Sequence, residues 1–181
     1  PIEFNDFDQS DSYQHYINTT ASPVSARCRP LPPEKFQLVK DHFSELLKSN
    51  IIEYSDSEWS SPLHVVSKKD GDIRPVGDYR ALNILTEKDC FPLPNIQQFN
   101  FSLKDKAVFS KLDLIKAYHN IPVALTDRPK TAIITPFGLF QYKRMPFGLK
   151  NAASSFHRYM ESLLGDIKGI YIYIDDILIA S

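Results

Sequence analysis

Apolar residues recur at helical spacing in two segments of the chain. The first segment begins at Pro33, and Asn50 is its predicted stop. Its apolar positions fall on one face of a helix: Phe36, Val39, Phe43, Leu46 and Leu47. The second segment covers residues 152–164 and is closed by Gly165. A third, shorter helix is expected near residues 95–103.

Alternation of apolar and polar residues predicts strands between these helices. The expected strands lie at residues 63–67, from Ile73 onward, and at 108–114, 131–135 and 139–145. A short helix at residues 115–119 follows the third of them. The resulting order is helix, hairpin, helix, strand, hairpin, helix, hairpin. This order predicts an α+β fold in which an antiparallel sheet packs against helices.

The last strand pair carries two adjacent carboxylates. Residues 171–181, YIYIDDILIAS, read as a hairpin whose turn is formed by Asp175 and Asp176. Two like charges side by side repel by roughly 1–4 kcal/mol at a protein surface, and a cation would relieve that repulsion. Hard divalent ions such as Mg²⁺ bind carboxylates together with substrate phosphates, which favours phosphoryl transfer. The alternative is a solvated Asp-Asp turn.

A third carboxylate, Asp113, lies near the end of the strand at residues 108–114. If this strand and the hairpin are neighbours in one sheet, the three aspartates converge. No basic residue is expected beside them, because none is close enough in sequence to be an obvious partner. The three acids therefore predict one metal site.

Composition fits a compact enzyme domain. The chain has 181 residues, of which 43% are hydrophobic, and no apolar run reaches membrane-spanning length. The acidic amino terminus is unlike a signal or transit peptide, so we expect an intracellular chain. Cys28 and Cys90 have no partners at the spacing of a disulfide framework or zinc site.

Basic residues are concentrated in the middle of the chain although the net charge is −1. Residues 60–150 contain 14 Lys and Arg against 8 Asp and Glu. This excess predicts a groove for a polyanion such as a nucleic acid. The alternative is that these lysines only solubilise exposed faces.

Four motifs occur in a fixed order along about 150 residues: WSSPLHVVSKKDGDIRPVGDYRALN, SKLDLIKAYHNIPV, TPFGLFQYKRMPFGLKNAASSF and the YIDD hairpin. In this the chain resembles reverse transcriptases, most closely the polymerase domain of gypsy-type long-terminal-repeat retrotransposons. The resemblance implies a right-hand polymerase with an extended lead-in at residues 1–30, a fingers-like segment at 31–91 and a palm-like segment at 92–181. It also implies that the palm is truncated after the catalytic hairpin. Thumb, connection and ribonuclease H regions would follow in a parent polyprotein.

The activity implied by the resemblance is RNA-directed DNA synthesis. Deoxynucleotides would be added to a primer 3′-hydroxyl on an RNA or DNA template with two Mg²⁺ ions, or with Mn²⁺ in their place. Asp113, Asp175 and Asp176 would be the catalytic metal ligands, together with the carbonyl of Leu114. The implied location is a cytoplasmic particle of the element with nuclear entry, and no membrane is involved.

The resemblance also suggests nucleotide-binding residues. Arg74 and either Lys68 or Lys69 would bind the triphosphate, since a planar guanidinium suits phosphate. Tyr118 would lie under the sugar and exclude a ribose 2′-hydroxyl, and an ordinary helix tyrosine is the alternative. Phe147 and Gly148 resemble the turn that lines the nucleotide pocket.

The nucleic-acid contacts implied by the resemblance are Asp78, Arg80, Lys150 and Tyr173. For Asp78 and Arg80 the alternative is an ion pair within the fingers, and for Lys150 it is a surface lysine. An accessory subunit or domesticated nucleic-acid-binding remnant is a rival function, as is a nucleotide cyclase or another palm-type transferase.

The 181-residue chain alone is expected to be a poor polymerase, because nothing in it would hold the primer end. Its last strand would lie near a sheet edge with three apolar residues exposed: Ile177, Leu178 and Ile179.

Overall fold

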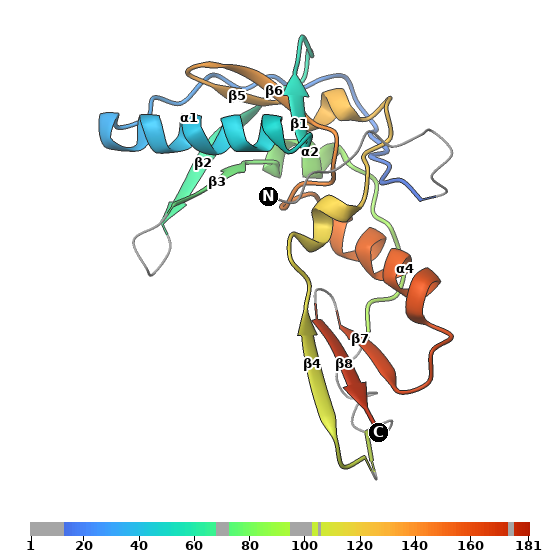
Figure 1. The fold of residues 1–181 in the computed structure, drawn as a ribbon. Coiled ribbons are helices and arrows are strands. Elements are labelled where there is room, and N and C mark those ends of the chain that lie inside the picture. Colours follow the sequence, from blue (N-terminus) through green and yellow to red (C-terminus); the bar gives the residue numbers. More distant parts are fainter. Residues whose placement is uncertain (1–12, 68–72, 95–102, 105, 174–175) are drawn as a thin grey trace.

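The computed structural model describes residues 13–67, 73–94, 103–104, 106–173 and 176–181. Two sheets lie at opposite ends of an elongated molecule (Figure 1). The upper sheet in that view has five strands and the long helix α1, whereas the lower sheet has three strands and the helix α4. The predicted helix near residues 95–103 lies almost wholly outside the described residues.

The upper sheet has the strand order β1-β6-β5-β2-β3. Its elements are α1 (Pro33–Lys48), β1 (Ile52–Tyr54), β2 (Ser61–Ser67), β3 (Ile73–Gly77), β5 (Ile133–Thr135) and β6 (Gly138–Tyr142). The short helix α2 (Arg80–Leu85) follows β3. The predicted hairpin of β2 and β3 is confirmed, with Leu63 paired to Gly77.

The pairing of β2 with β5 joins two segments that the sequence assigned to different subdomains. The pair is parallel, with Ser61 opposite Ile133 and Pro62 opposite Ile134. Residues 133–142, which we had assigned to the palm-like segment, therefore share a sheet with the fingers-like hairpin. Local alternation reveals a strand but not its distant partner, so this arrangement was not predictable from the pattern.

Helix α1 covers the upper sheet through the face predicted for it. Val39, Phe43 and Leu46 are buried, and the ring of Phe43 lies 5.2 Å from that of Phe140 on β6. The helix ends at Lys48, and Asn50 takes a left-handed conformation with φ 55°. Asn50 therefore acts as the predicted stop, because asparagine tolerates this backbone region.

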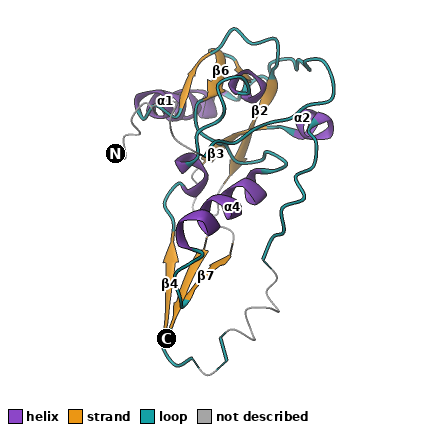
Figure 2. Ribbon diagram, turned by 90° about the vertical axis from the view of Figure 1, so that its right-hand side faces the viewer, coloured by secondary structure: helices purple, strands orange, loops and turns teal. Residues whose placement is uncertain are grey.

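The lower sheet is antiparallel and has the order β4-β8-β7. Its strands and the elements around it are β4 (Phe109–Asp113), the 3-10 turn η1 (Ala117–Asn120), α4 (Ala152–Leu164), β7 (Ile170–Tyr173) and β8 (Asp176–Ala180). The other 3-10 turn, η2 (Arg128–Thr131), contacts β6 of the upper sheet. Helix α4 contacts β7 (Figure 2). Ile172 and Ile177 are paired across β7 and β8 and are both buried, which marks one face of the sheet as part of the core.

Apolar exposure is greater on β4 than on β8. On β8 the predicted exposure is confirmed for Ile179, which is 37% exposed, and Leu178 is half-buried. The prediction of an exposed last strand is wrong for Ile177, which is only 6% exposed, because β8 lies between two neighbours. Strand β4 is an edge strand of this sheet, and all five of its residues are exposed. Phe109 and Leu112 are 51% and 48% exposed.

Residues 13–29, here called the N-terminal strap, run across both halves of the molecule. Isolated bridges join His15 to Val123, Thr19 to Thr86 and Ser25 to Ser60. The strap is therefore part of the packed structure. None of the helices within the described ranges is long and apolar enough to span a membrane.

Candidate active site

Two of the three predicted acids face each other across neighbouring strands. Asp113 is the last residue of β4 and Asp176 is the first residue of β8, and the two are directly opposite in the antiparallel register. Residues directly opposite in such a pair present their side chains on the same face of the sheet. The Asp113 residue is exposed, and the Asp176 side chain is 44% exposed. The expected neighbourhood of the two strands is confirmed.

Asp176 belongs to a strand and has a basic partner, so two details of the prediction are wrong. It pairs with Tyr173 and Asp113 as part of β8 and not as part of the turn. Its carboxylate Oδ2 lies 3.0 Å from the Nζ of Lys111, which is two residues before Asp113. The sequence did not reveal Lys111 as a partner of Asp176, because the two residues meet only through the pairing of β4 with β8.

The two described carboxylates suit a hard divalent cation, which prefers oxygen ligands. Within the described ranges no three His, Cys, Asp or Glu side chains gather closely enough to hold a metal ion. The third predicted acid, Asp175, lies outside those ranges. Leu114, whose carbonyl is the predicted fourth ligand, directly follows Asp113 and packs partly against the core. The donor chemistry therefore fits the metal that the sequence suggests.

Three of the predicted nucleotide-binding residues, Arg74, Tyr118 and Phe147, lie together in one cluster. The guanidinium carbon of Arg74, on β3, is 4.3 Å from the centre of the Phe147 ring. The Tyr118 ring, on η1, is 4.9 Å from that of Phe147 and 5.3 Å from that of Phe156. Tyr118 is only 9% exposed. Lys68 and Lys69 lie outside the described residues.

A cavity of about 230 Å³ opens beside this cluster and is lined in part by Arg74, Phe147, Lys116 and His119. Lys116 has φ 52° and ψ 39°, the left-handed conformation, and precedes η1. Burial lowers the pKa of His119 to about 4, so that its ring is neutral at pH 7. Lys116 was not singled out from the sequence, because a positive φ at a lysine leaves no mark in the pattern. His119 was given no role, because its spacing is not that of a metal ligand or general base.

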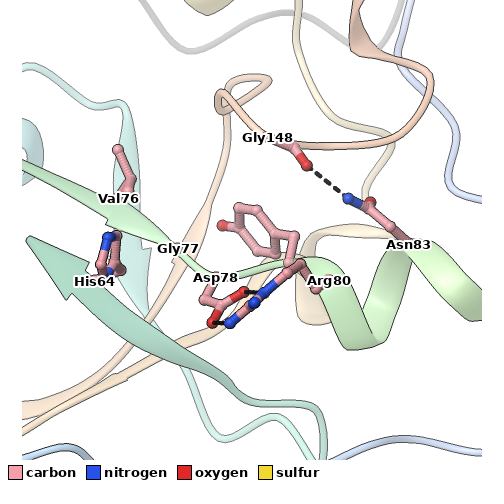
Figure 3. Close-up of a pocket in the computed structure, with 8 residues that line it drawn as sticks. His64, Val76, Gly77, Asp78, Arg80, Asn83 and Gly148 are labelled. Carbon is pink, nitrogen blue, oxygen red and sulfur yellow. Dashed lines mark hydrogen bonds and ion pairs between the residues drawn. The ribbon is translucent and has the colours of Figure 1, made fainter. Parts of the chain in front are cut away.

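A second cavity, of about 370 Å³, is lined by Asp78, Arg80, Asn83 and Gly148, among others (Figure 3). Asp78 accepts two hydrogen bonds of 2.7 Å from Arg80 and one of 3.0 Å from Arg29. The bonds from Arg80 are the main cause of a strongly lowered pKa at Asp78. The predicted alternative of an ion pair within the fingers is thus present in the structure.

The turn after Phe147 is held by α2. The side-chain amide of Asn83 donates to the carbonyl of Gly148 at 2.8 Å and accepts from the backbone N–H of Lys150 at 2.8 Å. Gly148 has φ +92°, a conformation that a side chain would strain. The Lys150 ammonium donates to the carbonyl of Thr86 at 2.7 Å. Tyr173 is opposite Asp176 in the register and thus shares the face of the acids.

Comparison with known proteins decides the family. Residues 66–181 match the family described as reverse transcriptase (RNA-dependent DNA polymerase). The chain belongs to the reverse transcriptase family. The matched range includes both sheets' central strands and every predicted site residue.

Relatives of this reverse transcriptase chain include transposon polyproteins of Schizosaccharomyces pombe. The Tf2-3 and Tf2-7 polyproteins are 40% and 39% identical to it over 154 residues, which is 84% of the chain. The chain spans only about 12% of the length of these polyproteins.

Solved structures of reverse transcriptases share the fold. A foamy viral protease-reverse transcriptase in complex with double-stranded DNA matches 95% of the chain with a TM-score of 0.85 at 23% identity, and the match covers 30% of that protein. The native prototype foamy virus protease-reverse transcriptase matches 93% of the chain with a TM-score of 0.80 at 22% identity, over 23% of its own length. The fold expected from the resemblance, α+β with fingers and palm, is confirmed.

Proposed function

We propose that the chain forms the fingers and part of the palm of a retrotransposon's RNA-directed DNA polymerase, of the gypsy type. The observation that carries the proposal is the face-to-face position of Asp113 and Asp176 within a reverse transcriptase fold. The polymerase would act within a longer polyprotein that supplies thumb, connection and ribonuclease H regions. We place it in a cytoplasmic particle of the element, with later entry into the nucleus.

Asp113, Asp175 and Asp176 would hold two Mg²⁺ ions together with the carbonyl of Leu114, and Mn²⁺ could replace them. When bound, the ions would lower the pKa of the primer hydroxyl and neutralise charge on the leaving phosphates. The protein's part is to fix the ligands on two paired strands, so that little reorganisation accompanies the reaction. Asp113 and Asp175 would be the principal ligands.

The incoming deoxynucleoside triphosphate would lie against the cluster of Arg74, Tyr118 and Phe147. Stacking on Phe147 orients the Arg74 guanidinium, which can then bind phosphate oxygens through two parallel hydrogen bonds. Lys68 or Lys69 would add a second positive charge. Tyr118 would limit the space beneath the sugar, and the positive φ of Gly148 would shape the pocket's turn.

Template and primer would follow the surface beside the cavity in Figure 3. The side chain of Arg80 is 83% exposed even though it pairs with Asp78, so its free edge can contact a phosphate. Asp78 would position Arg80 and would not touch nucleic acid itself. Lys150 and Tyr173 complete the proposed contacts. In support, the solved structures with this fold include foamy viral enzymes in complex with an RNA/DNA hybrid and with double-stranded DNA.

Substitution of Asp113 tests the proposal. In the longer polymerase, Asp113→Asn should reduce nucleotide incorporation by at least 1,000-fold while primer-template binding changes little, since the change removes a metal ligand and preserves shape. Primer extension and a binding titration measure the two effects. Asp166→Asn, an exposed position, is the matched control and should remain active.

Two outcomes would contradict the proposal. Near-normal incorporation by Asp113→Asn would remove Asp113 from the metal site. A wild-type polymerase that binds primer-template but incorporates nothing with either Mg²⁺ or Mn²⁺ would instead identify a domesticated nucleic-acid-binding remnant.

A further inference from the structure

Lys111 lies on the same face of the lower sheet as the two acids. In the antiparallel register Lys111 is opposite Leu178, and Asp113 is opposite Asp176. Because side chains alternate along a strand, Lys111 and Asp113 point to the same side, and Asp176 is diagonal to Lys111. The 3.0 Å separation of Lys111 Nζ from Asp176 Oδ2 agrees with this geometry.

This lysine offsets an electrostatic conflict in the sheet. Like charges directly opposite each other destabilise an antiparallel strand pair, and the facing carboxylates of Asp113 and Asp176 are such a pair. The Lys111 ammonium reduces that repulsion where it would otherwise loosen the edge strand β4. The protein thus carries its own cation beside Asp176, one of the proposed metal ligands.

We propose that Lys111 is a resident counter-cation, which stabilises the acid pair without metal and which a divalent ion displaces from Asp176. The inference rests on the proposed metal site and adds a residue that competes for it. It assigns to Lys111 a positioning role, because the ammonium acts on a metal ligand and not on substrate.

The ion pair has the properties of one that can be displaced. The side chains of Lys111 and Asp176 are 64% and 44% exposed. Exposed pairs of this kind contribute little stability, and the lysine stem has four flexible carbons on which the ammonium can move into water. A divalent ion brings twice the charge to the same oxygens. Removing the lysine should therefore make the site easier for a metal ion to occupy.

Direct measurement of Mn²⁺ binding to the 181-residue chain tests this inference without relying on activity. Free Mn²⁺ is followed by electron paramagnetic resonance during titration. Lys111→Met keeps the apolar stem and removes the charge, and it should tighten Mn²⁺ binding about three- to fivefold, in keeping with the small energy of an exposed pair. Lys111→Arg should bind as the wild type does. Lys40→Met, the same change on an exposed position of α1, should leave the affinity unchanged.

A double-mutant cycle separates displacement from a general field effect. If Lys111 competes for Asp176, Lys111→Met should have no effect on Mn²⁺ affinity in an Asp176→Asn background. A persistent threefold gain in that background would overturn the inference, as would an unchanged affinity of Lys111→Met alone.

Asp113→Asn distinguishes failure of this inference from failure of the proposed function. If Asp113→Asn abolishes binding but Lys111→Met does not change it, only the role of Lys111 is lost. If Asp113→Asn binds Mn²⁺ as the wild type does, both the metal site and the counter-cation are overturned.

Discussion

At the scale of the single residue, the side chain of Tyr118 combines a packing role with the proposed exclusion of ribose. It fills space between Phe147 and Phe156 in the core, and it is 9% exposed where the proposed nucleotide site begins. A side chain that is fixed by packing makes a better steric barrier than a free one, because it cannot swing away from a ribose 2′-hydroxyl. Burial and a sugar-excluding role are thus compatible.

Shortening this side chain should change sugar discrimination. In the longer polymerase, Tyr118→Val should raise ribonucleotide use relative to deoxynucleotide use by about ten- to a hundredfold, because a clash of roughly 1.4–3 kcal/mol is removed. The ratio of kcat/KM values for the two nucleotide types measures the effect. Phe147→Leu is the matched control, for which we expect weaker nucleotide binding with little change in that ratio. An unchanged ratio in Tyr118→Val would leave Tyr118 as an ordinary core residue.

The sequence predicted the place of Asp113 at a strand end, because local alternation marks that strand, and it predicted that Asp113 and Asp176 converge if β4 and β8 are neighbours. It placed Asp176 in the turn, whereas Asp176 begins β8. The partnership of Lys111 with Asp176 depends on the register of β4 with β8. A shift of one residue would place Lys111 on the opposite face, so no reading of the local pattern could assign it.

At the scale of elements, one buried carboxylate forms a hydrogen bond that holds the N-terminal strap against the rest of the chain. Asp127, just before η2, is 6% exposed and accepts a hydrogen bond of 2.9 Å from the backbone N–H of Ile17. Lys130 donates to the other oxygen of Asp127 at 2.7 Å and to the carbonyl of Ile17 at 2.6 Å. Ile17, Asp127 and Lys130 thus form a small hydrogen-bond network that holds this irregular part of the strap.

Removing this carboxylate should destabilise the whole chain. Asp127→Ala leaves the Ile17 N–H without its acceptor and the Lys130 ammonium without its counter-charge, so we expect the free energy of unfolding to fall by about 2–4 kcal/mol. Urea denaturation followed by circular dichroism measures this. Asp166→Ala at an exposed position should change it by less than about 0.5 kcal/mol. Equal stabilities for the two variants would show that the Asp127 network contributes nothing to the stability of the fold.

The long helices were predictable because their periodicity is sustained. Helix α4 has the predicted bounds and α1 begins at the predicted Pro33. The three-residue strand β1 and the six-residue helix α2 are too short to leave a periodic pattern, and neither was predicted. Strand β6 ends at Tyr142, earlier than expected, since Met145 bonds instead to the carbonyl of Ile121.

At the scale of the whole molecule, two buried histidines should make the fold sensitive to acid. Burial lowers the pKa of His15 and of His119 to about 4 each. His15 belongs to the N-terminal strap and shares a 2.8 Å hydrogen bond with Ser155 of α4, whereas His119 lies beneath the upper sheet, stacked on Tyr142. Both rings are thus built into the core as neutral groups.

Stability should fall as the pH drops from about 6.5 to 4. Over this range the unfolded chain binds protons at both histidines and the folded chain does not, so each histidine should cost up to about 3 kcal/mol by pH 4. His15→Asn should flatten that slope, and His119→Asn should do likewise. Urea titrations at several pH values measure the slopes. Above pH 7.5 the wild type and each variant should run parallel, and identical slopes below pH 6.5 would contradict the prediction.

The parallel pairing of β2 with β5 also has a consequence for synthesis of the chain. Ser61 must wait for Ile133, 72 residues later, before the two strands can pair. As the polypeptide leaves the ribosome, the β2–β3 hairpin has no partner on its β5 side until residues 133–142 have emerged. Strand β4 emerges before β5 and must not pair with the hairpin, because it belongs to the other sheet. Contacts so distant in sequence make folding slow and leave strand edges open to wrong partners. Chaperone binding to nascent chains that end between residues 80 and 130 is the expected result.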